Sequence, residues 1–306
     1  MKKLLFGFCV LIGLGSNAYR SERAGFVISV NGEENPYSIF SSFVMPGSDI
    51  LIHSKEAISI ESSDLKILKT GFLSEHEIGA PLTKGAYQLS VTNQDGKQIR
   101  VNILVMVPRT RKVGENLNGY RIGNYPTKPL NNNPIYAPPI GFFEVTKENE
   151  NLQLTPHFKV KQFLCKQAGN YPKYIIVRER LLLKLEYLLE RVNENGYEIE
   201  TFGFISGYRT PFYNKSIKNV QYSRHVYGGA ADIFIDQDKN GSMDDLNKDG
   251  KIDESDVQIF YNIVEGEFKK KRYQEKGFIG GLGFYRKNSR HNGFIHVDVR
   301  GSVARW

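Results

Sequence analysis

The sequence predicts a small all-β, sandwich-like domain followed by an α+β domain in which helices flank an antiparallel sheet. The first part holds short alternating runs of apolar and polar residues separated by turn signals. The middle holds one long leucine stripe at helical spacing, and the last part holds strand-like runs that carry His and Asp. With 306 residues, of which 40% are hydrophobic, the chain is long enough for two domains with separate cores.

Residues 24–108 are expected to form the all-β domain. Strand-like runs occupy residues 25–30, 49–53, 57–60, 86–91 and 100–107. The last two runs flank Asn93-Gln94-Asp95-Gly96, a hairpin turn signal. Several short strands with turns between them favour a sandwich. No constellation of reactive side chains falls in this part of the sequence.

Residues 1–18 have the pattern of a secretory signal peptide. A basic start, Met1-Lys2-Lys3, precedes an apolar run over residues 4–15 and a small-x-Ala ending at Ala18. The alternative, a membrane anchor, is disfavoured because the apolar run is short of the ~20 residues that span a bilayer. We therefore expect an exported protein, periplasmic or extracellular. Cleavage near Ala18 leaves Cys165 as the one remaining cysteine, so no intramolecular disulfide is expected.

Residues 109–141 are rich in Pro, Asn, Gly and Tyr and are expected to form a linker along the surface of one domain. Residues 142–306 form the expected second domain. Its clearest helix is predicted from Ile175 to Asn195, where leucines recur at helical spacing and Gly196 follows as a stop. A strand is predicted over residues 199–205.

The formal net charge of +8 suits a protein that works near an anionic surface such as a cell wall. Nucleic acid is the other partner that basicity suggests. The sequence has no basic cluster interleaved with aromatic residues and no nucleic-acid motif, so this class is excluded.

Two segments carry the residues that best fit a metal site. His225 and Asp232 lie in Ser223-Arg224-His225-Val226-Tyr227-Gly228-Gly229-Ala230-Ala231-Asp232, and His296 lies in the strand-like run 293–300. Neutral imidazole and carboxylate bind zinc well, and three protein ligands leave a fourth position open, as in catalytic zinc sites. In the second segment Phe294, His296, Asp298 and Arg300 alternate with aliphatic residues and so share one face of the strand.

These segments resemble the M15 peptidases, the zinc D-alanyl-D-alanine carboxypeptidases and endopeptidases of bacterial cell walls. The first segment fits the pattern SxHxxGxAxD, and the later HVD run follows it. Ser206-Gly207-Tyr208-Arg209-Thr210-Pro211 with Asn214 fits the SGYR segment of that family. The resemblance covers residues 142–306 and implies that His225, Asp232 and His296 are zinc ligands. It also implies that Arg209 lies near the substrate, where it would clamp a carboxylate or steady an oxyanion.

The resemblance leaves the general base open. Many relatives place an acidic residue or a His at the positions of Gly293 and Phe294, and neither of these residues moves a proton. Asp298 and His291 are the candidates; Asp298 is preferred, with the alternative that it orients a ligand. Ser223 is expected to hydrogen-bond substrate or a ligand.

A calcium loop is predicted in an insertion over residues 236–256. The run Asp245, Asn247, Asp249, Lys251, Asp253 and Asp256 offers oxygen donors at EF-hand positions 1, 3, 5, 7, 9 and 12, with Lys251 serving through its carbonyl and Gly250 at position 6. A partial second run, Asp236, Asp238 and Asn240, precedes it. The alternative is an acidic solvated loop. The expected calcium is structural, and a helix is predicted to follow the loop from Val257 to Glu265.

The leading functional hypothesis is an exported zinc metallopeptidase, a hydrolase of peptidoglycan stem peptides. The competing hypothesis is a cell-wall-binding module that zinc and calcium stabilise without catalysis. A third, a dockerin that binds a scaffold protein, is disfavoured because dockerins carry two calcium loops on separate helices and this run lies inside another domain.

Overall fold

The computed structural model describes residues 19–70, 74–289 and 291–306. The expected signal peptide, residues 1–18, lies outside the described residues. Over the described ranges no helix is both long enough and apolar enough to cross a membrane. The expected mixture of α and β structure is confirmed: many strands, mostly in antiparallel sheets, accompany few helices.

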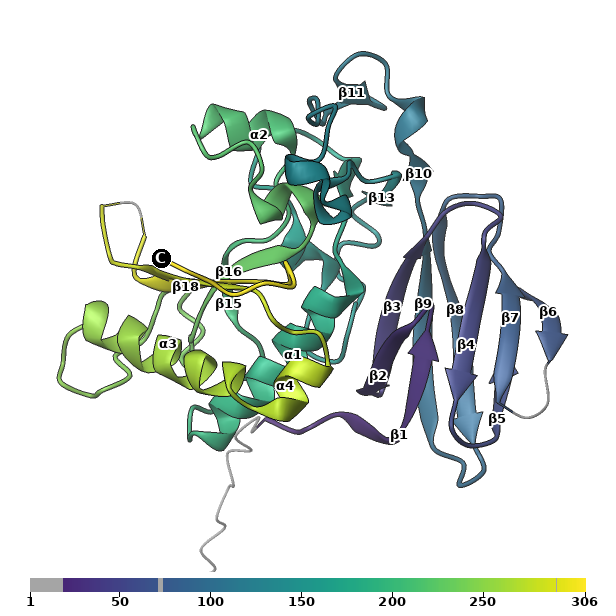
Figure 1. Ribbon diagram of the computed structural model, residues 1–306, viewed down its shortest axis with the longest axis horizontal. Helices are drawn as coiled ribbons and strands as arrows, with labels where there is room; N and C mark the ends of the chain where they lie inside the picture. The colour runs from purple at the N-terminus through teal and green to yellow at the C-terminus, as the bar shows by residue number, and fades with distance from the viewer. Residues whose placement is uncertain (1–18, 71–73, 290) are drawn as a thin grey trace, which may run out of the picture.

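The N-terminal part holds two sheets (Figure 1, purple to blue). Their strands are β1 (Arg23–Val30), β2 (Glu33–Tyr37), β3 (Ile39–Val44), β4 (Asp49–Ser54), β5 (Ile58–Glu61), β6 (Lys66–Thr70), β7 (Glu75–Gly79), β8 (Gly85–Asn93) and β9 (Gln98–Val105). One sheet has the order β2-β1-β4-β7-β6 and the other the order β3-β9-β8-β5. Strand β4 alternates strictly between exposed and buried residues, as expected where one face of a sheet covers a core. Strands β3 and β9 pair in parallel, while the other pairs in these two sheets are antiparallel.

The segment that the sequence indicated as a linker has local structure of its own. Strand β10 (Val107–Pro108) leads into it, and it contains η1 (Arg109–Arg111), β11 (Asn116–Leu117), β12 (Tyr120–Arg121), η2 (Leu130–Asn132) and η3 (Pro134–Tyr136). Several of its residues contact the C-terminal half. The Ile135 carbonyl accepts hydrogen bonds from Arg178 (3.0 Å) and Arg224 (2.8 Å). At Gly123 a side chain would lie 2.6 Å from the backbone nitrogen of Phe212, so the chain passes directly over that residue.

The C-terminal half is built on a five-stranded sheet of order β15-β16-β18-β17-β19. Its strands are β15 (Gly203–Ser206), β16 (Ala230–Phe234), β17 (Gly281–Tyr285), β18 (Phe294–Asp298) and β19 (Ala304–Arg305). The first four strands pair antiparallel, and β19 joins β17 in parallel. The remaining elements are β13 (Gly141–Val145), η4 (Val160–Phe163), β14 (Lys173–Ile175), α1 (Glu179–Glu194), α2 (Pro211–Ser216), η5 (Arg224–Tyr227), α3 (Glu254–Phe268) and α4 (Lys271–Glu275).

Three of the boundaries that differ from the sequence prediction have a clear structural cause. Helix α1 begins at Glu179 and not at Ile175, because Lys173–Ile175 pairs with β13 as strand β14. The strand predicted over residues 199–205 forms only at Gly203–Ser206, where β16 offers it a partner. Helix α3 begins at Glu254, three residues before the predicted Val257, because Asp253 caps it by accepting the Ser255 amide.

The two halves share one continuous apolar core. Helix α1 lies between them (Figure 1), and Glu190 of this helix binds the Arg23 guanidinium through two contacts of 2.8 and 2.6 Å. On its other side Lys184, fully buried, donates to the carbonyls of Phe278 (3.0 Å) and Asp298 (2.7 Å). Helix α1 thereby fixes the C-terminal end of strand β18, two residues beyond the candidate ligand His296.

Candidate metal centre

The three candidate ligands come from separate segments that the sheet brings together. Asp232 of β16 and His296 of β18 are direct register partners, so antiparallel pairing places both side chains on the same face. His225 lies on η5, which ends at Gly228 with a φ of +67°. A side chain at Gly228 would lie 2.4 Å from the Ile176 carbonyl oxygen, so this turn requires glycine.

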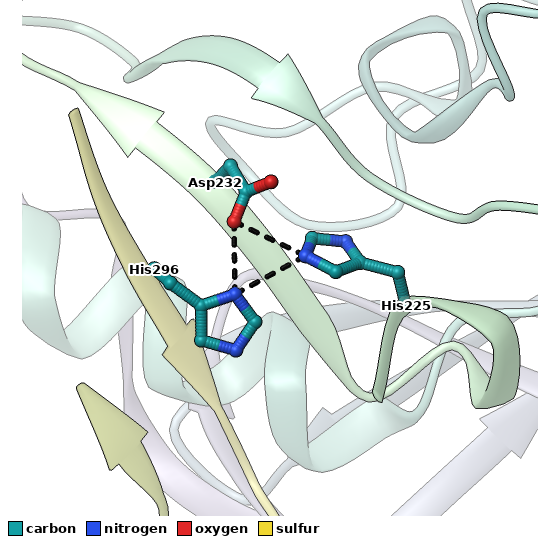
Figure 2. A group of neighbouring side chains, drawn as sticks. All are labelled: His225, Asp232 and His296. Atoms are coloured by element: carbon teal, nitrogen blue, oxygen red, sulfur yellow. Dashed lines mark hydrogen bonds and ion pairs between the residues drawn. The ribbon is translucent and has the colours of Figure 1, made fainter. Parts of the chain in front are cut away.

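The ligand atoms of these residues converge on one point (Figure 2). His225 Nε2 lies 3.1 Å from Asp232 Oδ1 and 3.1 Å from His296 Nδ1, and His296 Nδ1 lies 2.8 Å from Asp232 Oδ1. Ligand atoms bound tetrahedrally to zinc at 2.0–2.1 Å are separated by about 3.3 Å. All three residues are at most 5% exposed. The size of this triangle therefore suits a small, four-coordinate ion.

The opposite ring nitrogen of each histidine has its own partner. His225 Nδ1 lies 2.7 Å from the Gly207 carbonyl oxygen, and His296 Nε2 lies 3.2 Å from Asp298 Oδ2. Each of these partners accepts a hydrogen bond, so each ring carries its proton on the outer nitrogen and a lone pair on the inner one. This arrangement is typical of metal-binding histidines, and the residues present therefore fit zinc.

Burial and charge act in opposite directions on these three groups. Burial lowers the pKa of His225, which favours the neutral imidazole that binds metals. For Asp232, burial opposes ionisation, but its close interactions with His225 and His296 hold its pKa well below the usual range. For His296, burial is outweighed by the hydrogen bonds with Asp232 and Asp298, which raise its pKa.

Arg209 lies beside the cluster and is engaged within the protein. Its Nη2 binds Asp232 Oδ2, and its Nε donates to Ser206 Oγ at 2.8 Å. The residue is 8% exposed. The guanidinium thus occupies the Asp232 oxygen that faces away from the histidines and leaves the other oxygen, Oδ1, for a metal.

The Asp298 carboxylate lies behind His296, on the side away from the cluster. Besides His296 Nε2, its oxygens accept the Gly281 amide (2.8 Å) and the Arg300 amide (3.0 Å) and bind the Arg300 guanidinium. Burial alone would raise its pKa, but the hydrogen bonds from His296 and Arg300 hold it well below the usual range. Of the two roles that the sequence allowed for Asp298, this position matches the one that orients a ligand.

Packing closes the two positions, Gly293 and Phe294, where the M15 peptidases that the sequence resembles would carry a base. A side chain at Gly293 would begin 1.9 Å from Val257 Cγ2 on α3, and Phe294 stacks on Tyr285 with ring centroids 4.5 Å apart. His291, the other candidate base, packs its ring against Phe294 at 4.8 Å. Its Nδ1 bonds to the Asn292 carbonyl, and its Nε2 accepts from the Asn288 amide at 2.8 Å.

Two further residues are relevant to the candidate site, Ser223 from the sequence analysis and Lys166 from the structure. Ser223 is 8% exposed and forms the N-cap position of η5, where its carbonyl accepts the Val226 amide at 3.0 Å. The sequence did not indicate Lys166 as a site residue. The residue is exposed overall, partial burial lowers the pKa of its ammonium group, and the charges that act on that group are those of Asp232 and Arg209. A lysine after Cys165 has no motif of its own; only the packing of Phe163 against Gly207 brings its segment to the centre.

Both predicted calcium runs adopt one backbone conformation. Asp236 accepts the amides of Asn240 and Gly241 at 3.0 Å each. Asp245 accepts the equivalent amides of Asp249 (3.2 Å) and Gly250 (2.7 Å). The φ angles at the fourth and sixth loop positions are 60° and 84° in the first run and 60° and 85° in the second. The repetition indicates two consecutive loops of the same design.

The carboxylates converge more closely in the first loop. Oxygens of Asp236, Asp238 and Asp244 lie within 4.8 Å of one another. In the second loop, Asn247 Oδ1 accepts the Asp249 amide and Asp253 caps α3. The Asp256 carboxylate is buried and accepts the backbone amides of Leu246 (2.7 Å) and Asp253 (2.9 Å). The run that fits the sequence pattern less well is thus the one with the tighter cluster.

No protein-family model matches this chain, and a search of curated proteins finds no match either.

Proposed function

We propose that the protein is an exported zinc metallopeptidase with an M15-like catalytic domain, which hydrolyses peptide bonds in peptidoglycan stem peptides as a carboxypeptidase or endopeptidase. The observation that carries this proposal is the buried triangle of His225 Nε2, His296 Nδ1 and Asp232 Oδ1, in which both histidines present a lone pair inward. The SxHxxGxAxD, SGYR and HVD motifs supply the substrate class by resemblance.

When bound, zinc supplies a Lewis acid that polarises a carbonyl and makes water a stronger nucleophile at neutral pH. The protein's own residues hold the ligand side chains in place. Asp298 fixes the His296 ring, and Arg209 fixes the Asp232 carboxylate. Since Arg209 is engaged in this way, we assign the anchoring of a substrate carboxylate to the exposed ammonium of Lys166.

The proton acceptor in this proposal is His291. The oxygens of Asp298 are occupied by His296, Gly281 and Arg300, whereas His291 Nε2 contacts a neutral amide, that of Asn288, among the residues that the structure describes. Its Nδ1 proton is donated to the Asn292 carbonyl, which leaves Nε2 as the basic atom. His291→Gln is expected to lower kcat by about 100-fold, in the range for loss of a general base, and to leave zinc binding unchanged.

Turnover on isolated peptidoglycan tests the proposed activity. The wild-type protein is expected to release D-Ala or cleaved stem peptides, and a chelator or His225→Ala abolishes the release. The matched control is His53→Ala, which removes an exposed histidine of β4 and leaves activity intact. Hydrolysis that persists in both the chelated protein and His225→Ala contradicts the zinc mechanism.

The second candidate function is a non-catalytic module that binds cell wall. The closure of position 293 by Val257 favours it, because that position holds the acid in many relatives. A module of this kind sediments with peptidoglycan and releases nothing from it, whereas the enzyme does both.

Calcium is proposed as a structural ion of the insertion between β16 and α3, with Asp236, Asp238 and Asp244 as the tighter site. The first loop directly follows the strand of Asp232, and the second leads into α3, whose Val257 packs on Gly293 beside the last ligand strand. An ion in either loop would therefore stiffen the support of the zinc site.

A further inference from the structure

Trp306, the single tryptophan of the chain, lies on the sheet face that carries the metal centre. It follows β19, which pairs in parallel with β17, and its carbonyl accepts the Phe284 amide at 2.8 Å. The register places Gly283 of β17 directly beside His296. Trp306 is therefore one strand away from a candidate ligand.

The indole packs on two glycines of β17. A side chain at Gly281 would lie 2.8 Å from the outer edge of the Trp306 ring, and one at Gly283 would lie 2.6 Å from its Nε1. Both residues alternate on the metal face of the strand, so the indole rests directly on the backbone there. Any other residue at Gly283 would push the ring outward.

The ring is fixed on several sides and still presents surface to solvent. Its N–H donates to the Tyr285 hydroxyl at 2.8 Å, and its centroid lies 5.1 Å from that of the His296 ring. The Arg300 guanidinium, held by Asp298, lies 5.2 Å from the indole centroid. Even so, Trp306 is 46% exposed. A large aromatic surface with a satisfied N–H and a fixed orientation is typical of a binding platform.

We propose that Trp306 positions the substrate at the metal centre by stacking its exposed surface on an apolar, C–H-rich part of the peptide residue next to the cleaved bond. The inference rests on the proposed peptidase function and adds the residue that determines where the peptide lies. The indole N–H is already used by the Tyr285 hydroxyl, so the contact that the ring offers to a substrate is apolar and its partner is aliphatic.

The first test is the intrinsic fluorescence of the zinc-loaded protein titrated with an acetylated L-Lys-D-Ala-D-Ala peptide. Since Trp306 is the only tryptophan, all indole emission reports on this platform. Burial of the exposed ring surface is expected to give a saturable blue shift whose midpoint matches the KM. An unchanged spectrum at a peptide concentration that saturates turnover overturns the proposal.

The second test separates positioning from folding. Trp306→Ala is expected to raise KM by roughly tenfold or more, with kcat and zinc affinity within about threefold of wild type. Gly283→Ala keeps the indole but displaces it, and should raise KM in the same direction and shift the emission. The matched control is Gly266→Ala on α3, where a side chain meets nothing within 4 Å, and KM should not change.

The outcomes of the two proposals can be told apart. A KM that is equal in wild type, Trp306→Ala and Gly283→Ala overturns the platform and leaves the peptidase intact. A saturable emission shift without any peptide hydrolysis supports the platform and contradicts the peptidase.

Discussion

Asp298→Asn is the substitution that best distinguishes the two roles open to this residue. The side chain is completely buried, and it joins His296 Nε2 to the Arg300 guanidinium. Asparagine has the same shape and still accepts the Gly281 amide through its oxygen. Its amide group, however, faces donors at both His296 and Arg300, so at least one of these hydrogen bonds is lost.

The expected loss of zinc affinity follows from the role of the Asp298–His296 hydrogen bond, which orients the His296 ring. Loss of a carboxylate that orients a metal-binding histidine typically costs 10- to 100-fold in metal affinity, or about 1.4–2.7 kcal/mol. We expect the zinc dissociation constant of Asp298→Asn to rise by this factor. Activity at saturating zinc should return to within about tenfold of wild type, because the carboxylate does not face the inner side of the cluster.

Competition with a chromophoric zinc chelator measures the affinity, and circular dichroism checks the fold. Asp95→Asn, an exposed change in the β8–β9 hairpin, is the matched control. Zinc affinity within twofold of wild type, together with activity that zinc does not restore, refutes the orienting role and returns Asp298 to the position of general base.

Three further predictions concern buried charge, substrate and calcium. Burial lowers the pKa of Lys184 from 10.5 to about 7. Above pH 7 the unfolded chain therefore binds one proton more than the folded chain at this residue. The free energy of unfolding should rise between pH 7 and 9 by up to about 1.4 kcal/mol per pH unit. Denaturant titration should show this rise in the wild type, and an equal rise with pH in Lys184→Met contradicts it. Lys166→Ala should raise KM for a peptide with a free carboxylate by about three- to tenfold at unchanged zinc affinity, and Lys166→Arg should restore the wild-type KM. Equal KM values for wild type and Lys166→Ala in a carboxypeptidase assay exclude Lys166 as the residue that binds the substrate carboxylate. Asp236→Asn should weaken calcium binding in calorimetry and remove the calcium-dependent part of protease resistance, and resistance that is independent of calcium in wild type argues against a structural ion.

The candidate ligands could be predicted from the sequence because short-range rules determine their surroundings. The small residues before Asp232 and the alternation around His296 describe two strands, and direct pairing of these strands places both side chains on one face. The mixed α+β class could be predicted from the same alternation and from the leucine stripe of α1. The residue at which α1 begins could not be predicted, because it depends on the pairing of β14 with β13.

The surroundings of the ligands depend on contacts that no local pattern reports. Arg209 was expected to meet the substrate, but the structure pairs it with Asp232, which lies 23 positions later in the chain. Trp306 packs on Gly281 and Gly283 because β19 pairs with β17. Long-range packing of this kind determines which polar groups remain available for chemistry.

The most direct test of the metal centre is anomalous scattering at the zinc edge from crystals of the full chain grown with zinc. We predict one strong peak at about 2.0–2.2 Å from His225 Nε2, His296 Nδ1 and Asp232 Oδ1. Zinc density elsewhere in the crystal, with none between these three atoms, would contradict the central claim.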